Sequence, residues 1–200
     1  MLKVGITGGI GSGKTTVCKI FEVLGIPVFY ADAEAKRIMN TDDLLMSSIR
    51  QQFGDNAYSE TGQLNRSYLA GVVFNNEIEL EKLNQLVHPA VFRAFNEWVQ
   101  AQKGVPYVVK ETALLFESEA YKLCNYTILV SSTAELKIRR VIQRDNISKN
   151  EVELRMKKQF TDVKTAKLAD FIVTNDEKEL LLPQVIGLHE KFLEMALKND

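Results

Sequence analysis

The sequence predicts an α/β protein in which a five-stranded parallel sheet is flanked by helices. Short apolar runs of strand length are spread along the 200 residues, and helical periods follow most of them. The first run leads directly into the glycine-rich stretch GGIGSGKT (8–15). Residues from about 44 to 103 have a helical pattern with no convincing strand. We therefore expect one α/β core that carries a helical insertion.

The composition is typical of a soluble globular protein with one domain, or one core with insertions. The formal net charge of −1 argues against a broad basic surface for nucleic acid. No apolar run approaches the roughly 20 residues that span a bilayer, and the N-terminus lacks a secretory signal pattern. Cys18 and Cys124 are too few for a disulfide framework, so we expect free thiols in a reducing cytoplasm. We expect a monomer with no nucleic-acid or membrane partner.

The stretch GGIGSGKT matches the phosphate-binding pattern G-x-x-x-x-G-K-[ST] at its fixed positions, which are Gly8, Gly13, Lys14 and Thr15. It follows the alternating run 2–7, typical of a strand, and precedes residues 17–24, which have a helical period. Glycines let the backbone turn its N–H groups around an anion, and the helix N-terminus adds partial positive charge. We expect Lys14 to contact the outer phosphates and the Thr15 hydroxyl to bind the accompanying Mg²⁺. A glycine-rich turn without a ligand is the structural alternative.

A second short strand is predicted over Ile26–Tyr30, and Asp32 comes directly after it. In open α/β sheets ligands bind outside the carboxyl ends of the strands, so an acid here belongs near the phosphate loop. Asp is also a preferred N-cap, and Asp32 could merely cap the helix that continues through Asn40. Position alone leaves both interpretations open.

The middle of the chain is predicted to be helical. Leu45, Ile49 and Phe53 mark one helix that ends at Gly54, and further helical runs cover 68–74 and 80–99. His88 and Pro89 interrupt the longest run, where the proline must either break the helix or begin a new one. His88 is then either a polar residue packed at a helix junction or a substrate contact.

Two apolar runs, Val105–Val109 and Tyr126–Val130, are predicted to be buried parallel strands. The helices that follow the second strand are expected to open with capping boxes, formed by Ser132 with Glu135 and by Ser148 with Glu151.

Along these two helices, Arg140 and Arg144 are four residues apart and so share a face, as do Arg155 and Gln159. Such helices could close over a triphosphate as a lid. The alternative is that the arginines are solvated and paired with neighbouring acids such as Asp145, Glu151 and Glu153.

The last predicted strand, Phe171–Thr174, ends in Asn175 and Asp176 at the expected ligand edge. A C-terminal helix should cover the sheet, with Pro183 near its start and an apolar face formed by Leu182, Val185, Leu188 and Phe192. His189 has no evident partner and is interpreted as a surface or packing residue.

A phosphate loop, an acid near it, an acid at a later strand end and basic helices are the parts that a small-molecule kinase needs. Phosphoryl transfer depends on positioning, Mg²⁺, a carboxylate that orients the acceptor and cations that follow the moving charge. Asp32 would have to lie within hydrogen-bond reach of the acceptor hydroxyl. The guanine-reading N-K-x-D motif of GTPases is absent from the sequence.

At this level of detail the chain resembles the dephospho-CoA kinase family along nearly its whole length. The resemblance is carried by the acid at Asp32 and by GITGGIGSGKTTV (5–17), GQLNR (62–66), VF (73–74), LVHP (86–89), LLFES (114–118), QRD (143–145), R-x-x-x-Q (155–159) and ADFIVTN (169–175). It implies ATP-dependent phosphorylation of the 3′-hydroxyl on the ribose of dephospho-CoA, the last step of coenzyme A synthesis, with ATP and Mg²⁺ as cofactors. It also implies a P-loop kinase core (about 1–43, 104–138 and 165–200), a helical substrate domain (about 44–103) and a lid (about 139–164).

The resemblance also implies roles for individual residues. The ATP phosphates are assigned to Gly9, Gly11, Ser12, Gly13, Lys14, Thr15 and Thr16, and the adenine end of the site to Asn175. Asp32 is the implied base, with Lys14, Arg140 and Arg144 as the catalytic cations. Substrate contacts are assigned to Thr7, Arg66, His88 and Pro89.

Three positions depart from the family pattern. Tyr30 replaces the first acid of the D-A-D motif, Ala113 replaces the proline before LLFE, and Glu119 replaces a glycine that often follows it. Glu111 is left between a supporting role at Mg²⁺ and plain surface charge. The alternative functions are a nucleoside or nucleotide kinase and, from another class, an ATP-binding module without transfer activity.

Overall fold

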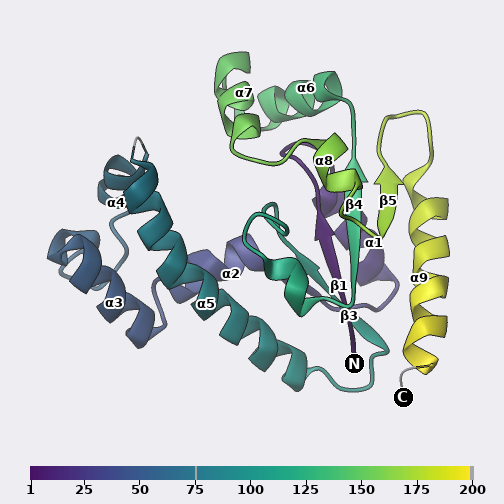
Figure 1. The fold of residues 1–200 in the computed structure, drawn as a ribbon, viewed down its shortest axis with the longest axis horizontal. Helices are drawn as coiled ribbons and strands as arrows, with labels where there is room; N and C mark the ends of the chain where they lie inside the picture. The colour runs from purple at the N-terminus through teal and green to yellow at the C-terminus, as the bar shows by residue number, and fades with distance from the viewer. Residues whose placement is uncertain (75, 199–200) are drawn as a thin grey trace. The chain divides into compact units, whose positions relative to one another are not determined.

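The computed structural model describes residues 1–74 and 76–198 and confirms the predicted α/β class (Figure 1). Its sheet has five parallel strands in the order β2-β3-β1-β4-β5. The strands are β1 (Leu2–Thr7), β2 (Val28–Tyr30), β3 (Tyr107–Glu111), β4 (Tyr126–Ser131) and β5 (Phe171–Thr174). The strand that feeds the glycine-rich loop is therefore central, with β3 and β4 on either side of it.

The chain divides into two compact units. The first contains Met1–Tyr30 and the chain from Gln102 onward, and the second is Ala31–Ala101. The first unit holds the sheet with α1 (Lys14–Val23), η2 (Ala120–Leu123), α6 (Ala134–Asp145), α7 (Lys149–Lys157), α8 (Asp162–Ala166) and α9 (Leu181–Leu197). The second is built from α2 (Ala31–Ile38), α3 (Asp43–Phe53), η1 (Asp55–Ala57), α4 (Arg66–Val73) and α5 (Glu77–Ala101). The helical unit thus begins with α2, which the sequence-based division assigned to the core.

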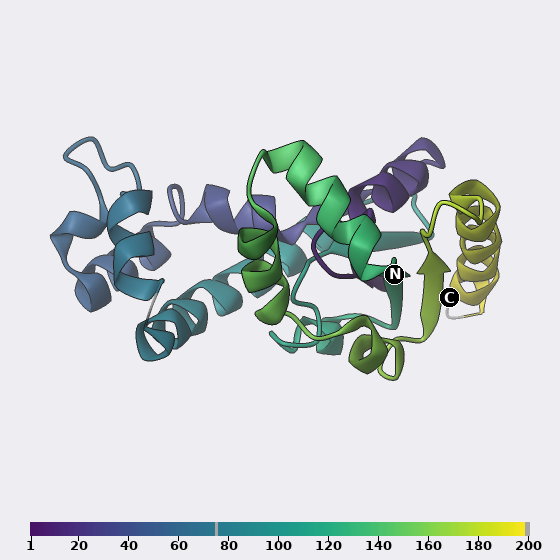
Figure 2. The same ribbon diagram turned by 90° about the horizontal axis from the view of Figure 1, so that it is seen from above.

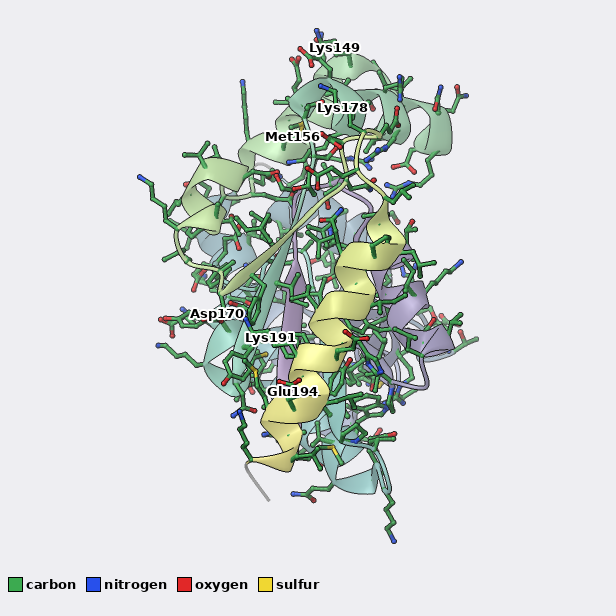
Figure 3. The ribbon with its side chains drawn as sticks, turned by 90° about the vertical axis from the view of Figure 1, so that its right-hand side faces the viewer. Lys149, Met156, Asp170, Lys178, Lys191 and Glu194 are labelled. Atoms are coloured by element: carbon green, nitrogen blue, oxygen red, sulfur yellow. The ribbon has the colours of Figure 1, made fainter. Side chains whose placement is uncertain are left out.

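One face of the sheet is covered by α1 and α9, and α9 runs beside β5 (Figures 2 and 3). Phe21 of α1 and Phe192 of α9 are fully buried against the strands. Tyr107 meets both rings, at centroid distances of 6.3 Å and 5.5 Å respectively. On the opposite face, Leu115 and Cys124 lie close to Gly5 of β1, and α8 packs on β4. The sheet is therefore covered on both faces, as expected for parallel strands.

The third strand begins later than its apolar run predicted, at Tyr107 rather than Val105. Pro106 has no N–H for the strand ladder, so pairing with β1 starts at Tyr107 and continues to Glu111. Lys110 and Glu111, which were expected after the strand, are in it and are buried. β2 is likewise shorter than expected and begins at Val28.

Of the two predicted capping boxes, one is confirmed and the other is wrong. Ser148 and Glu151 form the expected capping box at α7. The Ser132–Glu135 box is wrong, because α6 is capped by Thr133, whose hydroxyl accepts from the Leu136 N–H. Ser132 instead bonds Asp162 through its N–H and Arg140 through its hydroxyl, so the helix begins one residue later.

The predicted interruption at Pro89 is also wrong, because α5 continues through it. Val87, Ala90 and Val91 are buried around the proline, and α2, α3 and α4 all pack on α5. This packing outweighs the one helical hydrogen bond that a proline removes.

The C-terminal helix differs from its prediction at two positions. Leu182 is 54% exposed and does not belong to the buried face. His189 does have a partner, since its Nδ1 lies 2.7 Å from the hydroxyl of the buried Tyr107. Among residues 1–74 and 76–198, no helix combines the length and apolarity needed for a membrane span.

Candidate active site

The glycine-rich loop lies between β1 and α1, at the carboxyl end of the central strand. Gly11 and Gly13 have φ of 80° and 97°, in the left-handed region that favours glycine. Gly13 is the N-cap of α1, so Lys14, Thr15 and Thr16 form its first turn. The N–H groups of a first turn have no partner within their helix, and the helix dipole adds positive charge there. This is the geometry of an anion site.

The loop is in close contact with residues far along the chain. A Cβ atom on Gly11 would lie 2.5 Å from the carbonyl oxygen of Lys137 in α6. One on Gly13 would collide with Nδ2 of Asn175, which follows β5 and donates to the Ser12 carbonyl at 2.8 Å. Only glycine therefore fits at these two positions.

Lys14 is held between the loop and β3. Its Nζ donates to the Gly8 carbonyl at 2.8 Å and lies 4.0 Å from a carboxylate oxygen of Glu111. Glu111 is 8% exposed, so its interpretation as plain surface charge is wrong. A buried acid thus lies beside Lys14, the lysine expected to contact phosphate, as required for a group that supports a cation there.

Tyr30 occupies the end of β2, where the family pattern has an acid. Burial raises the pKa of its phenol, and the nearby Cys18 and a hydrogen bond with Glu22 raise it further. Burial also raises the pKa of the Cys18 thiol, with a further contribution from Glu111. Both groups are therefore neutral at physiological pH, so neither supplies the charge of the missing acid, whereas Glu111 is an acid beside Lys14.

Arg140 and Asn175 are brought together behind the loop. One Arg140 nitrogen, Nη1, donates to Ser132 Oγ at 3.2 Å and to the Gly11 carbonyl at 3.4 Å. Nη2 donates to the Asn175 carbonyl at 3.2 Å and to Glu177 at 3.1 Å. The guanidinium therefore joins the loop, the start of α6 and the end of β5.

Arg144 is not part of this cluster, although it was expected to act with Arg140. Its Nε and Nη2 donate to the Asp145 carboxylate at 2.7 Å and 3.0 Å, and its side chain is 62% exposed. Arg155 also donates to Asp145, at 3.2 Å, and these arginines hold the pKa of that carboxyl below its usual range. Both arginines are thus exposed and paired with Asp145 in this structure, and their action in a lid stays a prediction.

Gln159 has a contact that the sequence did not predict. α7 ends at Lys157, so Gln159 does not share a helical face with Arg155. Its Oε1 accepts the Ile10 N–H at 2.8 Å, and its Nε2 donates to the Ala113 carbonyl at 3.4 Å. Thr7, expected to contact substrate, is 3% exposed and donates to the same carbonyl at 3.5 Å.

A cavity of about 530 Å³ borders the loop in this unit. Its lining includes Gly9, Ser132, Lys137, Gln159 and Asp162. Lys137 and Asp162 form an ion pair there. No sequence pattern singled them out, because they are far apart in the chain and neither belongs to a motif.

The remaining candidates lie in the helical unit. Asp32 is exposed in the first turn of α2, which begins at Ala31, so it is not the N-cap of that helix. Arg66 is the exposed first residue of α4, after the N-cap Asn65. His88 is half-buried and stacks on Phe92 with the ring centroids 6.4 Å apart.

Pro89 is exposed and lines a groove of about 420 Å³ within the helical unit. The groove is formed by α3 and α5, with Leu44, Leu45, Ser48, Gln85, Leu86 and Arg93 as its other lining residues.

The donor set around the loop suits Mg²⁺ bound together with phosphates. In the described part of the chain, no three His, Cys, Asp or Glu side chains gather as a metal site. Mg²⁺ in phosphate sites takes only one or two protein oxygens and completes its shell with phosphates and water. The Thr15 hydroxyl and the Glu111 carboxylate are oxygen donors of this kind.

Comparisons with known proteins agree with one another. A family model described as dephospho-CoA kinase matches residues 2–180. The dephospho-CoA kinase of Salinibacter ruber is 42% identical over 88% of this chain and 89% of its own. A solved structure from Thermus thermophilus is 31% identical with a TM-score of 0.78, covering 99% of this chain and 95% of that one. The solved dephospho-CoA kinase of Campylobacter jejuni is 26% identical, with a TM-score of 0.70 and coverage of 99% and 98%.

Proposed function

The chain belongs to the dephospho-CoA kinase family, and we propose that it transfers the γ-phosphoryl group of ATP to the 3′-hydroxyl of the ribose of dephospho-CoA. The products are coenzyme A and ADP, and the reaction is the last step of coenzyme A synthesis. The observation that carries this proposal is the loop GGIGSGKT, built as an anion site at the N-terminus of α1 in a chain that matches the family along residues 2–180.

On the donor side, the backbone of Gly9 and of Gly11 through Thr16 binds the ATP phosphates. Lys14 turns from the Gly8 carbonyl, 2.8 Å away, to the outer phosphates. Asn175 and Arg140 donate to the Ser12 and Gly11 carbonyls of the loop, and Asn175, directly after β5, borders the adenine end.

Thr15 and Glu111 would hold Mg²⁺, directly and through water respectively. Bound there, the ion would neutralise charge on the β- and γ-phosphates.

On the acceptor side, Asp32 accepts the proton of the attacking hydroxyl as the general base. Its position two residues beyond the end of β2 supports this role, because ligands of open α/β sheets bind outside the carboxyl ends of strands. Thr7, Arg66, His88 and Pro89 are the proposed contacts to dephospho-CoA. The family motifs GQLNR and LVHP support three of these roles.

The segments of the chain also divide into a donor side and an acceptor side. We assign dephospho-CoA binding to the helical segment of about 44–103 and a lid function to about 139–164, with Arg140 and Arg144 as its cations. The Arg144 side chain that now pairs with Asp145 is 62% exposed, so a phosphate can compete for this arginine at little cost.

We further propose that the protein acts as a monomer in the cytoplasm. Donor-side and acceptor-side residues all come from one chain, and both cysteines are free thiols, which suits a reducing compartment. Sedimentation at assay concentration, with and without both substrates, tests the monomer.

The activity is tested by following ADP release from the purified protein with ATP, Mg²⁺ and dephospho-CoA. We expect multiple turnovers and a product identified by mass as coenzyme A. AMP and nucleosides serve as competing acceptors in parallel reactions. Turnover with a nucleoside monophosphate but not with dephospho-CoA would indicate a nucleotide kinase, and no turnover with any acceptor would indicate an ATP-binding module.

A further inference from the structure

Lys137 is a buried cation near the start of α6. Its side chain is 6% exposed, and its ammonium donates to Asp162, the first residue of α8. Burying an ammonium is costly unless it is paired, and the half-buried Asp162 carboxylate is the partner that stabilises it. The proposed catalytic and binding roles above include neither residue.

The Asp162 carboxylate is anchored on its other side by the end of β4. Its Oδ2 accepts from the Ser131 hydroxyl at 3.0 Å and from the Ser132 N–H at 3.3 Å, while Oδ1 accepts from Lys137. The carboxylate therefore has three donors, and through them the end of β4, α6 and α8 are fixed to one another.

Lys137 touches the phosphate loop with both its side chain and its main chain. A Cβ atom on Gly9 would lie 3.1 Å from the Lys137 ammonium, and one on Gly11 would lie 2.5 Å from the Lys137 carbonyl oxygen. The ammonium is thus packed between Asp162 and the loop backbone.

Ile10, the residue between these two glycines, is contacted by the segment that leads to Asp162. The Ile10 N–H donates to Gln159, three residues before Asp162. Gly9, Lys137, Gln159 and Asp162 all line the cavity of about 530 Å³. Three consecutive loop residues, 9, 10 and 11, therefore each contact either α6 or the segment 159–162. This segment follows α7 and leads into α8 (Figure 1).

We propose that the Lys137–Asp162 ion pair positions the phosphate loop, fixing Gly9 to Gly11 in the conformation that receives the phosphates of ATP. The inference rests on the proposed function only for the identity of the ligand. Lys137 is a positioning residue here, since it acts through the loop backbone. Without its ammonium, the loop loses the group beside Gly9 and must be ordered by the nucleotide itself, which weakens binding.

The central test is Lys137→Met in the full-length protein. Binding of Mg²⁺ and ATP is measured by calorimetry without an acceptor, and exchange of the Ile10 amide proton by NMR. We expect the ATP affinity to fall roughly 10- to 100-fold, the range seen when supporting groups around a site are removed. Exchange at Ile10 should accelerate, while amides of β4 and β5 keep their protection. The KM for ATP should rise, while kcat, measured at saturating ATP, should change less.

Two further variants separate positioning from a general loss of structure. Lys137→Met combined with Asp162→Asn removes both charges and leaves no half-buried carboxylate without its cation, so it should fold. It should still show weak ATP binding, because the ammonium beside Gly9 is missing. The matched control is Lys122→Met, which breaks the exposed Lys122–Glu119 pair, 2.7 Å apart and outside the segment assigned as the lid. This control should bind ATP like the wild type.

Wild-type ATP affinity and unchanged Ile10 exchange in the double variant would overturn the proposal and leave the pair as a fold contact only. This test of ATP binding does not depend on which acceptor the protein phosphorylates. A protein that binds ATP but phosphorylates no dephospho-CoA would contradict the proposed function, while the loss of affinity in both Lys137 variants would still support the inference.

Discussion

Lys110 is a buried ammonium in β3, with 1% of the residue exposed. Burial lowers its pKa from 10.5 to about 8, and the neighbouring Cys124 opposes this shift. Between pH 8 and 10.5 the unfolded chain therefore binds more protons at this lysine than the folded one does. The contribution of Lys110 to the free energy of unfolding must then rise with pH across that window.

We predict that Lys110→Met reveals this dependence. The difference in free energy of unfolding between the variant and the wild type should shift by about 3 kcal/mol in favour of the wild type between pH 7 and 10.5, given about 1.4 kcal/mol per pKa unit. Urea unfolding at several pH values measures it. Burial raises the pKa of Cys124 to about 11, so the pH dependence of either protein also includes thiol titration, and the comparison between the two removes most of it. Lys19→Met controls for the loss of one exposed charge, and a pH-independent difference for Lys110 would contradict the prediction.

Asp32 lies in the first turn of α2 with Glu34, and both acids interact favourably with the helix dipole there. If Asp32 is the general base, Asp32→Asn should lower kcat by about 10² to 10⁴ while the ATP affinity stays nearly intact. Glu34→Gln is the matched control. It removes an acid from the same turn, one that pairs with Arg37 at 2.6 Å, and it should leave kcat unchanged. Equal kinetic effects of both substitutions would assign Asp32 to helix stability alone.

Individual residues of the site were predictable where a local motif carries them. The spacing of Gly8, Gly13, Lys14 and Thr15 sufficed for the loop, because loop and helix are consecutive in the chain. The contact of Ile10 with Gln159 joins residues 149 positions apart, and the Lys137–Asp162 pair spans 25. Such pairings depend on the tertiary fold and leave no periodic signal.

At the scale of elements, predictions succeeded where the sequence of the element itself determines it. β5 has the predicted bounds, and α3 ends at Gly54 as predicted, where the glycine has a φ of 85°. The start of α6 was missed by one residue because Ser132 finds partners in Asp162 and Arg140. Local capping preference therefore yields to tertiary hydrogen bonds.

Pro89 gives a quantitative test of how packing overrides propensity within α5. A proline inside a helix costs roughly 3 kcal/mol, and restriction of the unfolded chain returns up to about 1 kcal/mol. We predict that Pro89→Ala raises the free energy of unfolding by about 2 kcal/mol, measured by urea titration. If Pro89 also contacts substrate as proposed, the KM for dephospho-CoA should rise in the same variant.

Pro183 is the matched control, because it lies in the first turn of α9. There the missing N–H would have had no partner in the helix. Pro183→Ala should change the free energy of unfolding by less than about 0.5 kcal/mol. A similar gain in stability at both positions would show that helix propensity, rather than the interrupted hydrogen bond, sets the effect.

For the whole molecule, the topology explains where the helical unit is inserted. β2 and β3 are parallel neighbours, and their connection has to cross over the sheet. Ala31–Ala101 occupies this connection, so the insertion enlarges a crossover that the fold requires in any case. The proposed donor residues lie in the first unit. Asp32, Arg66, His88 and Pro89 lie in the second.

This division predicts separate responses to the two substrates in hydrogen exchange of the full-length protein. A nonhydrolysable ATP analogue with Mg²⁺ should slow exchange in the loop and the first turn of α1 and leave α3 and α4 unchanged, because bound phosphates pair with N–H groups at that helix end. Dephospho-CoA alone should slow exchange in the helical unit. Lys14→Met should weaken the first response and spare the second. Protection by dephospho-CoA confined to the unit with the sheet would contradict the assignment of acceptor binding to the helical segment of about 44–103, since a ligand stabilises the segments it contacts.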